Sequence, residues 1–292
     1  GGLGSNGKIY TIHYHPTRPG HLYIGTSEGL YKSSDNLNTW IQLLPNADII
    51  DIEFHPSNPD IIYVYDNYYW GSNKNKVLKS IDGGLTFTAS TDITNNNNAK
   101  GKIAVTPYNP SLVYFASSNG VWRSDDEGAT FTFLSNPSNS CDGFAESDQD
   151  SLHMVYGYLD AENSTDGGYS FTQVTNWANS NPDSTYVHAD LRTVECIDGI
   201  FYTGTDGYFA RSYNNGYHWE RLNDGTGIRE FYKIGISQSN PNIHMAGSQD
   251  NGTSILNENG WIEWNGGDGM EAIIHPLNED WMMGSWQFGT RQ

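Results

Sequence analysis

Two eight-residue stretches, SIDGGLTF at Ser80–Phe87 and SDDEGATF at Ser124–Phe131, are intact copies of one phrase, Ser-x-Asp-x-Gly-x-Thr-aromatic, which we call the box. Three variants follow the same pattern with one or more changes: STDGGYSF at Ser164–Phe171, SSDNLNTW at Ser33–Trp40 and SYNNGYHW at Ser212–Trp219. The boxes begin at residues 33, 80, 124, 164 and 212, so successive starts are 40 to 48 residues apart. Because a four-stranded propeller blade takes about 40 to 50 residues, the period favours a propeller.

Each box begins at the end of a short apolar run and closes on an aromatic residue that opens another, so we interpret it as a strand-turn-strand corner. Its aspartate is placed to accept hydrogen bonds from backbone N–H groups of its own turn, and its glycine supplies backbone freedom. The positions concerned are Asp82, Asp126 and Asp166, with Gly84, Gly128 and Gly168. We therefore expect the boxes to be structural rather than ligand or metal sites.

Every repeat can be parsed as strands A, B, C and D, with the box between C and D. Most A strands end in a Pro-containing turn such as His15-Pro16 or His55-Pro56, and a B strand follows. The expected B strands are Leu22–Thr26, Ile61–Tyr65, Val113–Ser117, His153–Gly157, Ile200–Gly204, Ile243–Gly247 and Trp281–Ser285. Seven A–B hairpins predict an all-β propeller of seven blades with four antiparallel strands each, in a single domain over 1–292. A sixth, degenerate corner is expected around Ser254–Trp261. The last blade is incomplete, so we expect the native chain to continue past Gln292.

The composition excludes several classes of partner. With 34 acidic and 15 basic residues the formal net charge is -19, which disfavours nucleic acid and anionic membranes. No apolar run approaches the about 18 residues that a membrane-spanning helix needs, so membrane insertion is not expected. Glycine (32) and aromatic residues (9 Trp, 19 Tyr, 11 Phe) suit short strands joined by tight turns. These features are typical of an extracellular or cell-surface protein.

The two cysteines, Cys141 and Cys196, fall at the same place in successive repeats. A disulfide between neighbouring repeats is one interpretation, and two separate buried thiols are the favoured one.

The boxes resemble those of the Asp-box, or bacterial neuraminidase repeat, propellers. That family includes sialidases, sortilin-type receptors, two-propeller xyloglucanases and secreted surface proteins of Bacteroidetes. The second half of the chain is similar to the sortilin-like members from Bacteroidetes, often cargo of the type IX secretion system with a C-terminal sorting domain. The residues that carry this likeness are Val187-His188-Ala189-Asp190, Gly204-Thr205-Asp206-Gly207, Glu230-Phe231-Tyr232, Gly247-Ser248-Gln249-Asp250-Asn251-Gly252-Thr253 and Gly266-Gly267-Asp268-Gly269.

Antiparallel topology predicts where these polar residues gather. In such a blade the B–C and D–A loops share one end, opposite the boxes. We expect a ligand site there, because polar loops on a rigid scaffold commonly form one. The predicted site residues are His188, Asp190, Asp206, Glu230, Gln249, Asp250, Asn251, Asp268, Trp286 and Gln287. Nearby aromatic rings that can stack on sugars are Tyr65, Tyr68, Tyr69, Trp70, Tyr208 and Trp286. The alternative is that these aspartates only cap turns beside glycine.

Three functions remain open at this stage. The leading one is a secreted or cell-surface recognition or structural propeller that binds glycan or protein, without catalysis. The second is a glycoside hydrolase that uses two of the four carboxylates, Asp190, Asp206, Asp250 and Asp268. The third is a cargo module whose partner is secretion machinery.

Two members of the family fit poorly. A sialidase needs an arginine cluster, and arginines are few near the predicted site, where only Arg192 and Arg229 lie. The xyloglucanases carry an aspartate after the first B strand, where this chain has Thr26-Ser27-Glu28-Gly29. No cofactor is expected, since the nine histidines show no paired ligand spacing; a structural calcium ion held by Asp and Asn oxygens is the remaining alternative.

Overall fold

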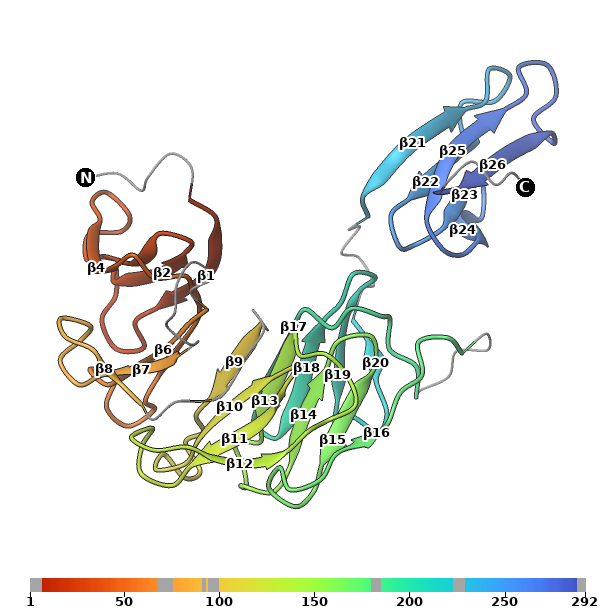
Figure 1. Cartoon of the computed structure of the whole chain (residues 1–292). Helices are drawn as coiled ribbons and strands as arrows, with labels where there is room; N and C mark the ends of the chain where they lie inside the picture. The colour runs from red at the N-terminus through yellow and green to blue at the C-terminus, as the bar shows by residue number, and fades with distance from the viewer. Residues whose placement is uncertain are drawn as a thin grey trace. The chain divides into compact units, whose positions relative to one another are not determined.

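A computed structural model describes residues 7–67, 76–90, 93, 100–179, 185–222 and 229–287. Within these ranges the regular elements are β-strands, paired antiparallel in six four-stranded sheets and one two-stranded sheet (Figure 1). The predicted β-propeller class of four-stranded blades is therefore confirmed. All seven A–B hairpins are present, and the B strands agree with the predicted ones to within one residue at each end.

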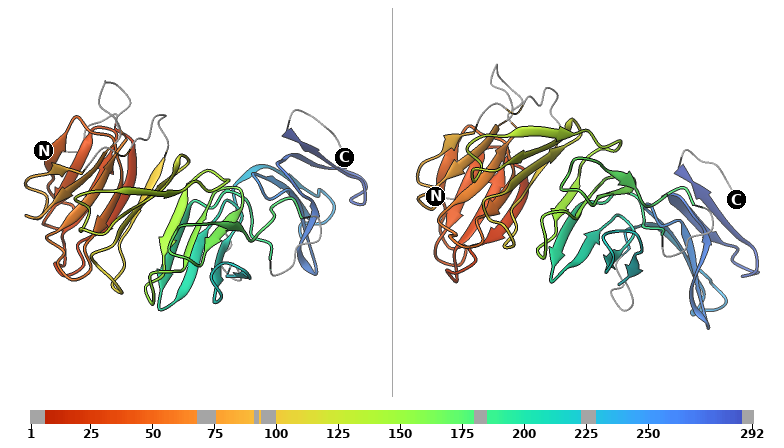
Figure 2. Two further views of the ribbon diagram at one scale, coloured as in Figure 1. Left: turned by 60° about the horizontal axis from the view of Figure 1, so that its bottom comes forward. Right: turned by 90° about the horizontal axis from the view of Figure 1, so that it is seen from below.

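The chain divides into two compact units, of which the first holds residues 1–205 and 209–221. It contains five sheets, seen in Figure 2 as separate twisted blades. The first two are β1 (Ile9–Tyr14), β2 (Leu22–Thr26), β3 (Gly29–Ser33) and β4 (Ile41–Pro45), then β5 (Ile49–Phe54), β6 (Ile62–Asp66), β7 (Lys76–Ser80) and β8 (Thr88–Ala89). The third is β9 (Gly101–Ala104), β10 (Val113–Ser117), β11 (Gly120–Ser124) and β12 (Thr132–Ser135). The last two are β13 (Gly143–Glu146), β14 (Met154–Gly157), β15 (Ala161–Ser164) and β16 (Thr172–Gln173), then β17 (Thr193–Ile197), β18 (Ile200–Gly204), β19 (Phe209–Ser212) and β20 (Glu220–Arg221).

The second unit holds residues 206–208 and 222–292. Its strands are β21 (Phe231–Ile236), β22 (His244–Ser248), β23 (Thr253–Asn257), β24 (Gly260–Asn265), β25 (Gly269–Ile274) and β26 (Met282–Trp286). The degenerate corner is a tight hairpin in which Asn257 pairs with Gly260. A single domain over 1–292 stays a prediction.

The core of the first unit lies between consecutive blades. Tyr23 and Leu30 from the first blade pack in one cluster with Ile52 and Val64 from the second. Because a B strand is covered on both faces, β2 and β10 are buried along their whole length, which explains their continuous apolar sequence. The A strands of successive blades, β1, β5, β9, β13 and β17, lie side by side.

The boxes have the predicted geometry. Ser124 Oγ accepts a hydrogen bond from Gly128 N (2.8 Å), and Asp126 accepts from both N and Oγ1 of Thr130 (2.8 Å each). The same bonds recur around Asp82 and Asp166. The glycine is needed because its φ is positive, 81° at Gly128, and a Cβ there would lie 2.8 Å from the Tyr63 ring.

Two further sequence predictions concern thiols and membranes. Cys141 and Cys196 are free thiols, as favoured above, with Cys141 buried and Cys196 half-buried. In the described part of the chain no helix has the length and apolarity to cross a membrane.

Candidate functional site

The second unit brings several predicted loop residues together between its strands. The backbone N–H of Asp250, in the turn from β22 to β23, donates to Asp268 Oδ1 at 2.8 Å, ahead of β25. Asn251 Nδ2 donates to the carbonyl oxygen of Asp206 at 3.2 Å. Gln249 N donates to the carbonyl oxygen of Glu230 at 3.0 Å. We call Asp206, Asp250 and Asp268 the acidic cluster.

The electrostatics of the acidic cluster centre on Asp250. Its backbone is left-handed, with φ 52°. Burial raises the pKa of the Asp250 carboxyl, and the neighbouring carboxylates of Asp268 and Asp206 raise it further. Ionising Asp250 would place a further negative charge beside these carboxylates, so its carboxyl keeps a proton to higher pH than an isolated aspartate does.

Aromatic side chains border the same region. Tyr232 is 42% exposed, and burial together with the charges of Asp268 and Glu230 raises the pKa of its hydroxyl. Trp286 Nε1 donates to the carbonyl oxygen of Gly266 at 2.8 Å, so this half-buried ring lies against the loop that leads to Asp268. Gln287 is exposed directly after β26.

His188 and Asp190 belong to the first unit, in the connection between β16 and β17. His188 Nδ1 lies 3.1 Å from the carbonyl oxygen of Ala189. Asp190 has a φ of 63° and pairs with Arg192 at 3.2 Å, and Arg192 also contacts Asp142. This ion pair gives Asp190 a local partner within its own turn.

Two of the aromatic residues predicted to stack on sugars do not suit that role. Tyr65 is fully buried and packs on Phe115 with ring centroids 4.6 Å apart, because it belongs to a B strand covered on both faces. Tyr208 is only 8% exposed. Tyr68, Tyr69 and Trp70 lie outside the described residues.

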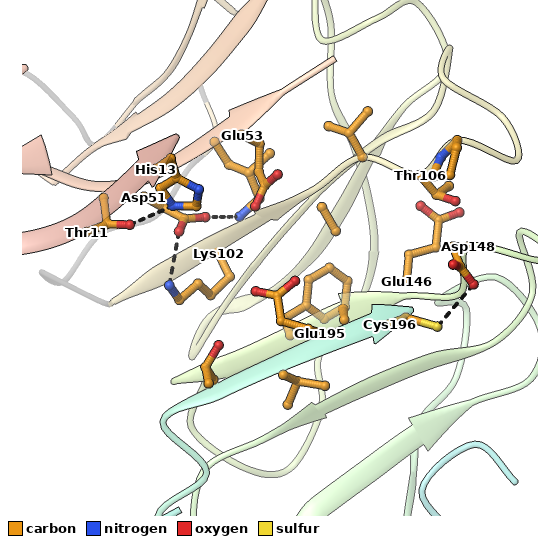
Figure 3. Close-up of a pocket in the computed structure, with 18 residues that line it drawn as sticks. Thr11, His13, Asp51, Glu53, Lys102, Thr106, Glu146, Asp148, Glu195 and Cys196 are labelled. Atoms are coloured by element: carbon orange, nitrogen blue, oxygen red, sulfur yellow. Dashed lines mark hydrogen bonds and ion pairs between the residues drawn. The ribbon is translucent and has the colours of Figure 1, made fainter. Parts of the chain in front are cut away.

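Sequence reasoning missed a cavity of about 170 Å³ in the first unit (Figure 3). Its wall comes from the A strands β1, β5, β9, β13 and β17 and from the residues after them, and we call it the A-strand cavity. The side chains with polar atoms that line it are Thr11, His13, Asp51, Glu53, Lys102, Thr106, Glu146, Asp148, Thr193, Glu195 and Cys196. The sequence pattern that could have indicated this cavity is the alternation of Asp51 and Glu53 with apolar residues along β5.

Comparison with protein-family models finds no match. Among curated proteins, a xyloglucanase of Hypocrea jecorina is 25% identical over 215 residues, covering 63% of this chain and 25% of that protein. A probable oligoxyloglucan-reducing end-specific xyloglucanase of Neosartorya fischeri is 28% identical over 148 residues, 44% of this chain and 18% of its own length. The chain therefore spans about a quarter or less of these relatives.

Solved structures share the fold. The GH74 enzyme of Niastella koreensis superposes with a TM-score of 0.58 at 17% identity, over 99% of this chain and 54% of that one. The GH74 xyloglucanase of Xanthomonas campestris gives 0.59 at 16% identity, over 98% and 52%. YCF48 from Cyanidioschyzon merolae gives 0.52 at 12% identity, over 97% and 92%. At these identities the likeness establishes a β-propeller fold.

Proposed function

We propose that this chain acts on glycans as a glycoside hydrolase whose carboxyl pair is drawn from the acidic cluster. The observation that carries the proposal is the raised pKa of Asp250 beside two other carboxylates. Glycoside hydrolysis needs one carboxyl that keeps its proton as general acid and a second that is ionised. The xyloglucanases among the relatives support the same chemistry.

The contacts within the cluster suggest a role for each carboxyl. Asp268 accepts the backbone N–H of Asp250 and lies within hydrogen-bonding reach of its side chain, so it serves as a positioning residue. A catalytic pair must be about 5 Å or more apart to flank the scissile bond. We therefore assign Asp250 as general acid and Asp206 as the ionised partner.

The substrate class follows from charge and from the aromatic rings. A formal charge of -19 opposes binding of anionic polysaccharides. Tyr232 and Trp286 offer partly accessible rings that can stack on neutral sugars. We propose a neutral plant-type β-glucan such as xyloglucan, encountered outside the cell or at its surface.

A second candidate is a propeller that binds glycan without cleaving it. It is favoured by Thr26-Ser27-Glu28-Gly29, which joins β2 to β3 at the place where the xyloglucanases carry an aspartate. The Asp-box, sortilin-like and Bacteroidetes assignments also remain proposals, as do a protein partner, cargo status in type IX secretion and a structural calcium ion.

An assay of the reducing sugar ends released from xyloglucan, cellulose and mixed-linkage glucan tests the proposal. We expect release from at least one substrate, reduced about 100-fold or more in Asp250→Asn, because a general acid contributes at least that factor. Asp206→Asn should lose activity as well. The matched control is Glu258→Gln, an exposed acid of the same unit, which should be unchanged.

Affinity electrophoresis in gels containing the same polysaccharides separates the two candidates. Retarded migration without sugar release would favour the binding propeller. If the protein neither releases sugar nor is retarded in the gel, both glycan hydrolysis and glycan binding are contradicted.

A further inference from the structure

The A-strand cavity belongs to the first unit, and its lining includes five acidic side chains. His13, Asp51 and Lys102 lie toward one end, and Thr106, Glu146 and Asp148 lie at the other (Figure 3). His13, Asp51, Lys102 and Glu146 lie on A strands, where alternate residues face the same side, and Thr106 and Asp148 follow such strands.

The one lysine in this wall is already engaged. Lys102 Nζ lies 3.0 Å from Asp51 Oδ1, and Asp51, only 3% exposed, also accepts the backbone N–H of Ile103 at 2.7 Å. The attraction of Asp51 raises the pKa of Lys102 to about 12. Burial lowers the pKa of His13, so its ring is not a cation at neutral pH. Lys102 is thereby paired with Asp51, and among the described residues no other lysine or arginine lines the cavity.

Two of these carboxyls, Glu53 and Glu195, face the cavity from β5 and β17. Burial raises the pKa of Glu53, and the charges of Asp51 and Glu195 add to the effect. Burial followed by the charge of Asp51 raises the pKa of Glu195. Within the described ranges, no hydrogen bond or ion pair satisfies either carboxyl. Glu53 is therefore costly to ionise without a positive partner.

Glu146 gives an independent sign that the wall is incomplete. It is 5% exposed and lines the cavity from the end of β13, yet neither carboxyl oxygen has a hydrogen-bond partner among the described residues. Buried polar groups in proteins are nearly always hydrogen-bonded, and an exception calls for a ligand or another explanation. Asp148 beside it is satisfied, because it accepts the N–H groups of Asp198 and Gly199 at 2.6 and 2.7 Å.

We propose that the A-strand cavity binds a small organic cation bearing protonated amines, held by the carboxylates of Glu53, Glu195 and Glu146. Coulomb attraction in a partly desolvated cavity favours a cation strongly and rejects anions. Among the described residues no three acidic, His or Cys side chains are grouped for a metal ion, so the carboxyls are spread for an extended ligand. A volume of about 170 Å³ suits it, since a cavity of about 150 Å³ accommodates benzene, with six heavy atoms.

The probe is 1,4-diaminobutane, and the control is 1,4-butanediol, a neutral molecule of equal length. Binding of each to the whole chain is measured by isothermal titration calorimetry. We expect the diamine to bind at least tenfold more tightly than the diol. The double variant Glu53→Gln/Glu146→Gln should bind at least tenfold more weakly than the parent, and Glu258→Gln on the exposed surface should bind normally. Glu195→Gln, which alters an exposed wall position, is a second variant should the double variant not fold.

Measuring the protons released on binding distinguishes binding in this cavity from general attraction of the diamine to an acidic surface. The diamine should release protons from Glu53, which faces Asp51, Glu195 and Lys102, and from Glu146, which is influenced by Asp150 and Arg123. The apparent binding enthalpy should then change with the ionisation enthalpy of the buffer, and this dependence should fall in the double variant. Equal binding of amine and diol, unchanged binding in the variants, or stronger binding of calcium ion than of the diamine would each overturn the proposal.

Discussion

The hydroxyl of Tyr63, on the B strand of the second blade, donates a hydrogen bond to the backbone carbonyl of Glu127, 3.1 Å away in the box of the third blade. Tyr23 makes the equivalent bond to Gly83 in the box of the second blade, also at 3.1 Å. The boxes of the second and third blades therefore close their own turns and also receive a bond from the preceding blade. The corresponding hydroxyl of Tyr114 has no partner among the described residues.

We predict that Tyr63→Phe destabilises the protein by about 1 to 2 kcal/mol, because it removes a buried hydrogen bond and leaves the Glu127 carbonyl unpaired. Urea unfolding at neutral pH measures the effect. Tyr114→Phe is the matched control and should be close to neutral, since its hydroxyl has no hydrogen-bond partner in the part of the chain that the structure describes. Equal losses in the two variants would contradict the role of this link.

Asp126→Ala should lower the free energy of unfolding by about 1 to 3 kcal/mol, because it removes the acceptor for both N and Oγ1 of Thr130. Thermal unfolding followed by circular dichroism measures the change. Asp126→Asn should lose less, since Asn214 accepts the equivalent backbone bond from His218 at 2.9 Å in the fifth box. An unaltered melting temperature in the alanine variant would refute the assigned role.

The boxes predict a loss of stability in acid. Hydrogen bonds from the Thr86 side chain and backbone lower the pKa of Asp82 to about 2, and bonds from Ser124 and Thr130 lower that of Asp126 to about 2. Since an unfolded aspartate titrates near pH 3.9, this stabilisation is present above about pH 4 and lost as the pH falls toward 2. Melting temperatures across pH 2 to 5 should show a shallower fall in Asp82→Asn/Asp126→Asn than in the parent. Parallel curves of melting temperature against pH for the parent and the variant would contradict this role of the two aspartates.

Glu146 predicts the opposite dependence. Burial, with the charge of Asp150, raises the pKa of Glu146 to about 9. An unfolded glutamate ionises near pH 4.3, so the folded protein binds an extra proton between these values and loses stability as the pH rises. Glu146→Gln should remove this loss, on the order of 1 kcal/mol per pH unit. Its melting temperature relative to the parent should climb from pH 5 to 8, whereas the exposed control Glu258→Gln should show a constant difference.

The corners could be predicted from the sequence because the bonds that close each turn are local. The hydrogen bonds of a box join residues within one stretch of seven, as they do among Ser124, Asp126, Gly128 and Thr130. The spacing of these residues alone therefore specifies the turn. Leu37 shows the limit of this rule, since it takes the positive φ of 70° at the glycine position without a glycine. Tertiary packing can thus hold a conformation that local preference disfavours.

The site was partly predictable for a topological reason, and the cavity was not. Asp250 follows β22 and Asp268 follows β24, two strands that run in the same direction, so antiparallel order alone suggests that both lie at one end of the blade. The A-strand cavity draws between two and six residues from each of five blades, and the directions of their side chains depend on register, which a one-residue shift would reverse. Tyr65 was misplaced because B strands are covered on both faces, whereas its sequence position only indicated proximity to a loop.

The acceptor in the link between neighbouring blades is a main-chain oxygen, carried by Gly83 in one box and Glu127 in the next. A substitution at that residue leaves the acceptor in place, provided that the turn around it, in which Gly83 and Glu127 both have a positive φ, survives. A gene duplication that copies one blade with its box therefore also copies a ready-made receptor for the tyrosine of the blade before it. New blades inserted in this way would be joined to their neighbours before any interface has had time to adapt.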